Sequence, residues 1–466
     1  MQDKKALPLQ GVRTIIIGAG FAGLSAAIEL ARLGAAVRLF EASQDLKAQG
    51  DVIRFEANAS RVMEPWGQVL EEAVKAAAPL DKLEIMDHHG KLLLEQPLDT
   101  VFDGYPNVYV NRGHVQRLMV DHAISLGVEI NLGFPVSQVF ETDTKAGVRI
   151  RHETYEADCV LAGDGVKSKA RSVVTGLADR PKKSGFAIYR AWFPLSALEG
   201  DASLGDLIHA KRPLCKLWIA PDSHAILTTN LNMRAATCFL THKDVSDVHE
   251  DWNQRGDVGD MLAGVQGWDA QLSRIIKNIP SEGLIDHKML WRDPVRKWVS
   301  ERGRICLLGD AAHPHLPTSG TGGAQSFEDS ATIGSLMTES AERNQDGKPD
   351  MPLVFQAYEK LRYERTSLTQ RMGWETRHIW HQTDWDAVAR DPNVLRMPQP
   401  AWLLGHDARK YAVDNYDAVI SHLQHGTPFV GRNVPEGHVH EDWTVEMLLG
   451  REGQVAEEDF YKVRDW

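Results

Sequence analysis

The stretch that decides the fold lies near the start of the chain and reads VRTIIIGAGFAGLSAAIELARLGAAVRLFE over residues 12–41. It opens with a continuous apolar run, Val12–Ile17, which is typical of a central strand of a parallel sheet, buried on both faces. The Ala- and Leu-rich segment Leu24–Leu33 predicts a helix, and Ala36–Phe40 predicts a second strand. Together they form a βαβ unit of about 30 residues.

Three glycines, Gly18, Gly20 and Gly23, join the first strand to the helix with the spacing GxGxxG. The first permits a tight turn, the second lets a pyrophosphate approach the backbone, and the third lets helix and strand pack closely. The helix N-terminus then offers free N–H groups to the phosphates. Glu41 ends the second strand, where a carboxylate can accept hydrogen bonds from ribose hydroxyls. This predicts a site for FAD or NAD; the alternative is a glycine-rich turn in another α/β protein.

A second motif, over residues 304–329, favours FAD. The predicted strand Arg304–Leu308 delivers Asp310 to a sharp turn, where its carboxylate can accept a hydrogen bond from a ribityl hydroxyl. The glycine-rich segment that follows opens a helix and contains Pro317, Gly320, Gly322, Gly323 and Ala324. Its backbone can approach a flavin ring closely, and its N–H groups can stabilise negative charge at the N1–C2 carbonyl region of that ring.

A third motif follows the predicted strand Cys159–Ala162, which ends in Gly163-Asp164-Gly165 and is followed by Ser168 and Arg171. We expect Asp164 and Arg171 to form an ion pair that holds this turn. The turn is then either a structural support beneath the cofactor or part of the cofactor and nicotinamide site.

The three motifs, in this order over residues 12–370, resemble the class A flavin-dependent monooxygenases, typified by para-hydroxybenzoate hydroxylase and salicylate hydroxylase. The resemblance implies that FAD is the cofactor and that Glu41 binds its adenosine ribose. It also implies that Gly50 and Val52 lie in a segment passing near the flavin ring, although the family often has glycine at the position of Val52. Arg112, ahead of a predicted helix, resembles the family arginine that contacts the cofactor.

The resemblance further implies a reaction. NAD(P)H would reduce FAD, O2 would add at C4a of the flavin to give a hydroperoxide, and one oxygen atom would pass to an electron-rich aromatic or heteroaromatic metabolite. Resemblance in the Gly50–Trp66 stretch and at Arg190 to fungal indole-alkaloid monooxygenases implies, more narrowly, indole 2,3-epoxidation in alkaloid biosynthesis, a branch of secondary metabolism. Three alternatives stay open: a phenol or salicylate-type hydroxylase, an FAD-dependent reductase or dehydrogenase without oxygen transfer, and a flavin-binding scaffold without turnover.

Two residues are candidates for catalysis, Arg190 and Asp51. Arg190 lies in the otherwise apolar strand FAIYRAWF, and an inward-facing charge there needs a partner. In relatives an arginine of this strand lies in the active site, where it could hold a substrate oxygen; the alternative is an arginine at the strand edge that faces water. Asp51 is a general acid or a partner for a substrate amine, or it simply stabilises a turn. Thr228 stands where some phenol-dearomatising relatives have a tyrosine, which disfavours that chemistry.

The predicted fold class is α/β, with a Rossmann-like FAD-binding domain interleaved with a mixed-sheet substrate domain and followed by a mostly helical or irregular C-terminal region. Residues 1–80, 103–183 and 295–370 form the first domain, 81–102 and 184–294 the second, and 371–466 the third region. The substrate would be a small aromatic or indole-like molecule, and Trp192, Trp218 and Trp291 are candidates to line its pocket.

Charge and composition exclude several functions. Lys and Arg number 52 against 64 Asp and Glu, for a net charge of −12, which disfavours nucleic acids and anionic membranes as partners. The polar start MQDKKALPLQ lacks an apolar signal core, so we expect a cytoplasmic protein without stable membrane insertion. The sequence leaves the oligomeric state open.

Cysteine and histidine placement argues against metals and disulfides. The four cysteines form no CxxC pair, which excludes a disulfide scaffold and a standard zinc finger and fits a reducing compartment. Four C-terminal histidines have no cysteine or clear carboxylate set beside them, so we expect no metal site; they are His422, His425, His438 and His440. His313 and His315 lie beside the flavin motif and could tune it.

Overall fold

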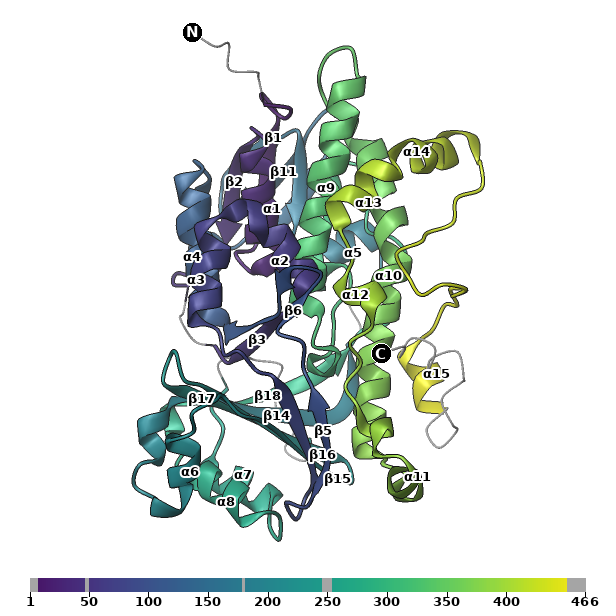
Figure 1. The fold of residues 1–466 in the computed structure, drawn as a ribbon. Helices are drawn as coiled ribbons and strands as arrows, with labels where there is room; N and C mark the ends of the chain where they lie inside the picture. Colours follow the sequence, from purple (N-terminus) through teal and green to yellow (C-terminus); the bar gives the residue numbers. More distant parts are fainter. Residues whose placement is uncertain (1–6, 47–49, 178–180, 245–253, 451–466) are drawn as a thin grey trace.

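The computed structural model describes residues 7–46, 50–177, 181–244 and 254–450. Figure 1 shows an upper body built around a parallel sheet, a lower body built around a second sheet, and a long helix running alongside both. Each body has its own cluster of buried apolar side chains.

The upper body is built on a five-stranded parallel sheet with the order β19-β13-β1-β2-β9. Its strands are β1 (Arg13–Ile17), β2 (Ala36–Glu41), β9 (Glu129–Leu132), β13 (Cys159–Ala162) and β19 (Ile305–Leu307). β1 lies at the centre, with Ile15 aligned with Val160 on one side and with Arg38 on the other. The buried isoleucine run therefore forms the central strand, as its uniform hydrophobicity predicts.

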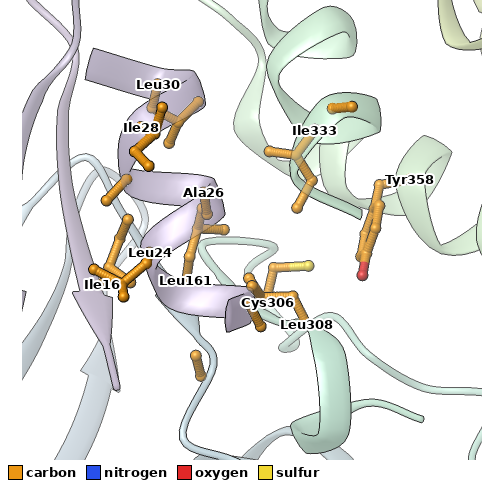
Figure 2. Packing of buried hydrophobic residues seen from close by; sticks show 14 of the residues in the cluster. Ile16, Leu24, Ala26, Ile28, Leu30, Leu161, Cys306, Leu308, Ile333 and Tyr358 are labelled. Atoms are coloured by element: carbon orange, nitrogen blue, oxygen red, sulfur yellow. The ribbon is translucent and has the colours of Figure 1, made fainter. Parts of the chain in front are cut away.

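Helices cover both faces of this sheet. They are α1 (Phe21–Arg32), α2 (Ala57–Met63), α3 (Gln68–Ala76), α4 (Arg112–Ser125), α5 (Lys169–Thr175) and α9 (Gly322–Arg343). Figure 2 shows side chains of one core on α1, the sheet and α9: Leu24 of α1 lies near Leu161 of the sheet, and Ile333 belongs to α9. A small antiparallel sheet, β10 (Gln138–Glu141), β11 (Ala146–Ile150) and β12 (Glu153–Ala157), completes the upper body.

The lower body is a seven-stranded mixed sheet with the order β18-β14-β17-β16-β15-β4-β5. Its strands are β4 (Lys82–Asp87), β5 (Leu92–Pro97), β14 (Lys182–Pro194), β15 (Cys215–Ala220), β16 (Ser223–Asn230), β17 (Ala235–Lys243) and β18 (Leu284–Trp291). Figure 1 shows α6 (Gly205–Ile208), α7 (Val258–Gly264) and α8 (Ala270–Lys277) beneath it. β4 pairs in parallel with β15, so a segment that precedes α4 in the chain is built into this second sheet.

Two strand pairs link the bodies: β3 (Val52–Phe55) with β8 (Val108–Asn111), and β6 (Val101–Phe102) with β7 (Tyr105–Pro106). The remaining helices are α10 (Met351–His381), α11 (Trp385–Arg390), α12 (Ala401–Leu404), α13 (Ala408–Asp414), α14 (Tyr416–His425) and α15 (Val445–Gly450). Figure 1 shows α10 running the length of the molecule. Among the described helices, none is long and apolar enough to cross a membrane.

The C-terminal region is bonded into the upper body through a buried carboxylate on α1. Arg409 of α13 donates to both oxygens of Glu29, at 2.7 and 3.2 Å, and Glu29 is 1% exposed. The indole of Trp66 donates to the same carboxylate at 2.5 Å. A residue far along the chain therefore supplies a cationic partner for this buried carboxylate.

The lower body contacts α10 through two buried histidines. Nδ1 of His224 on β16 lies 2.8 Å from Nε2 of His381 at the end of α10. Burial lowers the pKa of His224 to about 3, helped by Arg377, and lowers the pKa of His381 to about 2. Both imidazoles are therefore neutral in the folded protein at pH 7, and one donates to the other.

This pair predicts a loss of stability in mild acid. The unfolded chain protonates these histidines near pH 6.5, whereas the folded chain does not, so their contribution is intact above pH 6.5 and falls as pH decreases. We expect a loss of about 1.4 kcal/mol per pH unit for each imidazole below that point. Denaturant unfolding between pH 7.5 and 5 measures it. A His224→Gln/His381→Gln variant should show a shallower slope, and the exposed His425→Gln should not; equal slopes in all three proteins would contradict the assignment.

Candidate active site

The three glycines of the first turn differ in what would surround an added side chain. A Cβ on Gly18, which has φ +95°, would collide with the Gly163 carbonyl, and one on Gly23 would collide with the Gly18 carbonyl. A Cβ on Gly20 would meet no atom within 4 Å. The fold therefore requires two of the three glycines, and the third leaves open space at the N-terminus of α1. That N-terminus has no side-chain cap and no acidic residue in its first turn, which suits a phosphate.

Glu41, at the end of β2, is held against this turn. One carboxylate oxygen accepts from the backbone N–H of Ala19 at 2.7 Å, and the other accepts from that of Ser43 at 2.8 Å. The carboxylate thus lies beside the open glycine, at the carboxyl end of the sheet, where an adjacent ribose is expected.

The three sequence motifs meet at this edge of the sheet. β1, β13 and β19 are neighbours, so the turns that follow them lie side by side. A Cβ on Gly163 would lie 3.0 Å from the backbone nitrogen of Gly23, and one on Gly309 would lie 2.6 Å from Cβ of Ala22. Stretches near the start and two-thirds along the chain therefore form one continuous surface.

The turn after β13 corrects one expectation, because Asp164 and Arg171 do not pair. Asp164 instead accepts from the backbone N–H of Lys169 at 2.9 Å, at the start of α5. Arg171 is buried and donates to the carbonyl oxygens of Ala311, at 2.7 Å, and of Asp310. Both side chains form hydrogen bonds to main-chain groups, because the peptide N–H and C=O groups at these turns require hydrogen-bond partners.

Asp310 lies on the turn that Arg171 supports. Its side chain is exposed but stands among many protein atoms, and this desolvation raises the pKa of its carboxyl, while His313 and Arg171 act in the opposite direction. The turn itself is held by Asp329 of α9, which accepts from the backbone N–H of Gly309 at 2.9 Å and is bonded to His313 at 2.7 Å. His313 is thus a structural support. Burial lowers the pKa of His315 to about 3.

The glycine-rich segment begins after the short turn Pro317–Ser319, where Gly320 has φ +66°. α9 starts at Gly322, and Ala324 is fully buried. A Cβ on Gly323 would lie 3.0 Å from Cδ1 of Ile53, so this segment packs directly against β3.

β3 brings Gly50, Asp51 and Val52 to the same place. Val52 pairs with Asn111 at the end of β8, and the Asn111 amide donates to the Gly50 carbonyl at 2.7 Å. A Cβ on Gly50 would collide with the side chain of Arg112, whose guanidinium carbon lies 5.9 Å from the ring centroid of Phe21 in the first glycine turn. Arg112 thus lies between the Gly50 segment and the first glycine turn.

Asp51 and Arg190 form an ion pair. The sequence patterns predicted the two residues separately and did not connect them. The two side chains are 9% and 11% exposed, and Arg190 also lies over Phe239, 5.4 Å from its ring centroid. Burial and the nearby Arg112 lower the pKa of Arg190, while the Asp51 carboxylate opposes that effect. The other oxygen of Asp51 is buried with no hydrogen-bond partner among the described residues. The pair joins the upper body to β14 of the lower body.

Sequence reasoning missed a buried charge cluster behind the glycine-rich segment. Glu328 receives two hydrogen bonds from Arg365, both 2.8 Å, and one from Arg362, while Arg362 also donates to Asp329 at 2.9 Å. Asn58 donates to Glu328 at 2.6 Å. The sequence offered one signal for it: Arg362 and Arg365 are three positions apart on a predicted helix, and another predicted helix contains the acidic pair Glu328–Asp329.

Among the remaining candidates, Trp218 belongs to the core. Trp218 is fully buried and its indole donates to Asp269 at 2.9 Å, which makes it a core residue. Trp192 is half-buried on β14, and Trp291 ends β18. Thr228 is buried opposite Cys215. In the part of the chain that is described, no group of three or more His, Cys, Asp and Glu side chains is arranged to hold a metal ion.

Comparison with known proteins gives a consistent assignment. The family described as "FAD binding domain" matches residues 11–254 and 262–347. The asperlicin C monooxygenase of Petromyces alliaceus is 34% identical over 422 residues, covering 89% of this chain and 90% of the relative. The FAD-dependent monooxygenase fmqB of Aspergillus fumigatus is 31% identical over 408 residues, covering 83% and 96%.

Solved structures agree. FqzB is 32% identical with a TM-score of 0.82, covering 92% of this chain and 99% of that one. CtdE, solved in complex with FAD and a substrate, is 30% identical with a TM-score of 0.82, covering 88% and 99%. Salicylate hydroxylase, at 21% identity and a TM-score of 0.69, covering 86% and 97%, shares the fold. The open glycine turn, the glycine-rich segment and these matches together show that the chain belongs to the class A FAD-dependent monooxygenases of the fungal secondary-metabolite type.

Proposed function

We propose that this monooxygenase uses NAD(P)H and O2 to insert one oxygen atom into an electron-rich heteroaromatic metabolite, and that the reaction is 2,3-epoxidation of an indole in alkaloid biosynthesis. The observation that carries the proposal is the buried Asp51–Arg190 pair beside Gly50 and Arg112. It places a cation, and a carboxylate oxygen without a partner among the described residues, at the junction of the two bodies.

The chain's own residues divide between holding FAD and orienting the substrate. Gly18, Gly20, Gly23 and Glu41 would hold the pyrophosphate and adenosine ribose. Asp164 and Asp310 would lie at the turns beside the ribityl chain, Arg112 at the junction, and Gly50, Val52 and the segment Pro317–Ala324 along the ring. Bound FAD supplies the activation of oxygen.

Arg190 and Asp51 are suited to position a substrate that has both an oxygen and an N–H group. The guanidinium can donate to an oxygen and stabilise negative charge that develops on it. The carboxylate oxygen of Asp51 that lacks a described partner can accept the N–H of an indole. Because both groups are buried, their hydrogen bonds are stronger than they would be in water.

A substrate panel tests the proposal. Holoenzyme is incubated with NADH or NADPH and ¹⁸O₂ together with indoles, phenols and hydroxybenzoates. We expect NAD(P)H oxidation stimulated by indoles, with one labelled oxygen atom in the product. Oxygen transfer to phenols alone would favour a salicylate-type hydroxylase, and oxidation of NAD(P)H without labelled product would contradict the proposal.

Substitution of the ion pair tests its role. We expect Arg190→Gln and Asp51→Asn to lower kcat/KM by about a hundredfold, because each change removes a buried hydrogen-bonding charge and leaves its partner without it. FAD content should stay at the wild-type level. Arg212→Gln removes an exposed partner of Asp81 on the same body and serves as the control. Unchanged kcat/KM in both pair variants would exclude them from the site.

We also propose that the protein works in the cytoplasm. All four cysteines are free, and Cys159, Cys238 and Cys306 are buried. Burial raises the pKa of Cys159 and of Cys238 to about 12, so both thiols stay protonated and unreactive. Free thiols are typical of a reducing compartment.

A further inference from the structure

A second buried ion pair, Arg54 with Glu56, lies beside the glycine-rich segment. Arg54 lies in β3, and Glu56 directly follows the strand in an extended conformation, so two positions separate the residues and their side chains lie on the same side of the chain. Their side chains are 8% and 1% exposed. The guanidinium carbon of Arg54 lies 3.9 Å from the position that a Cβ on Gly320 would occupy. The pair therefore touches the turn where the flavin ring and the substrate are expected to meet.

The other neighbours of Arg54 come from three separate parts of the chain. Its NH1 lies 3.5 Å from the sulfur of Met397, and its guanidinium carbon lies 6.0 Å from the ring centroid of Tyr109. Met397 is fixed by two hydrogen bonds to the side chain of Gln96 on β5, both 2.9 Å. Arg54 thus stands where the upper body, the lower sheet and the C-terminal region converge, and its position is defined by all three.

The hydrogen bonds of the pair are only partly satisfied, and burial raises the pKa of Glu56 while Arg54 lowers it. Burial alone would lower the pKa of Arg54, but Glu56 and Tyr109 raise it above its ordinary value, so the guanidinium stays cationic. NH2 of Arg54 donates to one oxygen of Glu56. Nε of Arg54 and the second oxygen of Glu56 are buried with no hydrogen-bond partner among the described residues. A buried donor and a buried acceptor left unsatisfied are costly, and such atoms are expected to have a partner.

We propose that Arg54 and Glu56 recognise a secondary amide of the substrate, with Nε–H of Arg54 donating to the amide oxygen and the free oxygen of Glu56 accepting the amide N–H. A cis amide, as in a lactam or cyclic dipeptide, presents one acceptor and one donor along a single edge, which matches one donor and one acceptor from this pair. The inference rests on the proposed function for the location of the substrate, and it adds the substrate's class. Arg54 and Glu56 are positioning residues, since they bind away from the ring that is oxidised.

Matched ligands test this in the holoenzyme. The first pair of probes is cyclo-(Trp-Ala) and its di-N-methyl derivative, and the second is 2-quinolone and N-methyl-2-quinolone, which contain no indole. Dissociation constants come from the change in flavin absorbance. We expect each N–H compound to bind about tenfold or more tightly than its N-methyl counterpart, because methylation leaves the carboxylate oxygen unpaired.

Variants separate the hydrogen bond from the bulk of the methyl group. Arg54→Met/Glu56→Leu removes both charges together and so leaves no isolated buried charge, and Glu56→Gln keeps the shape of the side chain. In Glu56→Gln the side-chain oxygen accepts from Arg54, so the amide NH2 faces the ligand and cannot accept its N–H. Both variants should retain FAD and bind the N–H and N-methyl compounds within about twofold of each other. The control variant is Arg38→Gln/Glu129→Gln, which removes an exposed ion pair. It should keep the wild-type preference for the N–H compounds.

The outcomes distinguish the two proposals. A preference for N–H quinolone without any oxidation of indoles would support amide recognition and contradict indole epoxidation. Equal binding of both members of each pair by the wild type, failure of both pairs to bind, or a preference that persists in Arg54→Met/Glu56→Leu would overturn amide recognition, whichever compounds are oxidised.

Discussion

Protein with Gly23 replaced by alanine is expected to be purified without FAD. The Cβ would collide with the carbonyl oxygen of Gly18 and lie 3.3 Å from a methyl group of Ile16, so α1 could not keep its distance from β1. Because the turn and the N-terminus of α1 are formed by this contact, the phosphate site would be lost together with the packing. The ratio of absorbance at 450 nm to that at 280 nm measures the loss.

Two other glycines provide the comparison. Gly20→Ala should leave the apoprotein as stable as the wild type, since its Cβ meets no protein atom, yet weaken FAD binding by about tenfold or more because the methyl group occupies the space left for the pyrophosphate. Gly200→Ala, at an exposed position with equal space around it, should change neither property. Full FAD content in Gly23→Ala would contradict the packing argument.

The second large effect is expected for Glu328→Gln. The Glu328 carboxylate is fully buried; burial raises its pKa, but Arg365 and Arg362 outweigh that effect and hold the pKa well below its usual range. The amide would leave Arg362 with Asp329 as its carboxylate partner and Arg365 bonded to main-chain carbonyl oxygens. Removal of one partner from a buried charge network costs about 3–5 kcal/mol. Denaturant unfolding and the temperature of FAD release on heating measure the change.

A less buried carboxylate on the same helix is the control for this variant. Glu339 is 15% exposed and pairs with Arg343 four residues later, whose side chain is 43% exposed. Such pairs contribute about 0–1 kcal/mol, so Glu339→Gln should be close to neutral. If Glu328→Gln were no more destabilising than Glu339→Gln, the cluster would not stabilise the fold.

Local sequence patterns were sufficient for the central strand of the parallel sheet and the turn that follows it. The run Val12–Ile17 predicted a strand buried on both faces, and residues 13–17 form the central strand. Gly18 and Gly23 predicted a tight turn, and the structure shows that a Cβ at either position would collide with a backbone carbonyl. The predicted strand Arg304–Leu308 was also confirmed as β19, beside β13. These features succeed because each depends on residues adjacent in the chain.

The contacts that could not be predicted from the sequence join residues that are far apart in the chain. Asp51 and Arg190 were each proposed for the site, but nothing within either segment shows that they pair across 139 positions. The charges on Arg54 and Arg365 look the same in sequence as those of solvated arginines, and only burial reveals that they need partners. Asp164 and Arg171 failed as a pair because local peptide groups competed for both side chains.

The bond between Glu29 and Arg409 has a consequence for how the protein is made. The two residues are 380 positions apart, so at a synthesis rate of about 5–20 residues per second a ribosome completes the first roughly 20 to 80 s before the second. Throughout that interval the Glu29 carboxylate of the nascent dinucleotide-binding unit has only the more distant Arg32, at 3.5 Å on the same helix, as a cationic partner. We therefore expect its first helix to settle only after the last quarter of the polypeptide has been translated, which makes the growing chain a natural client for chaperones.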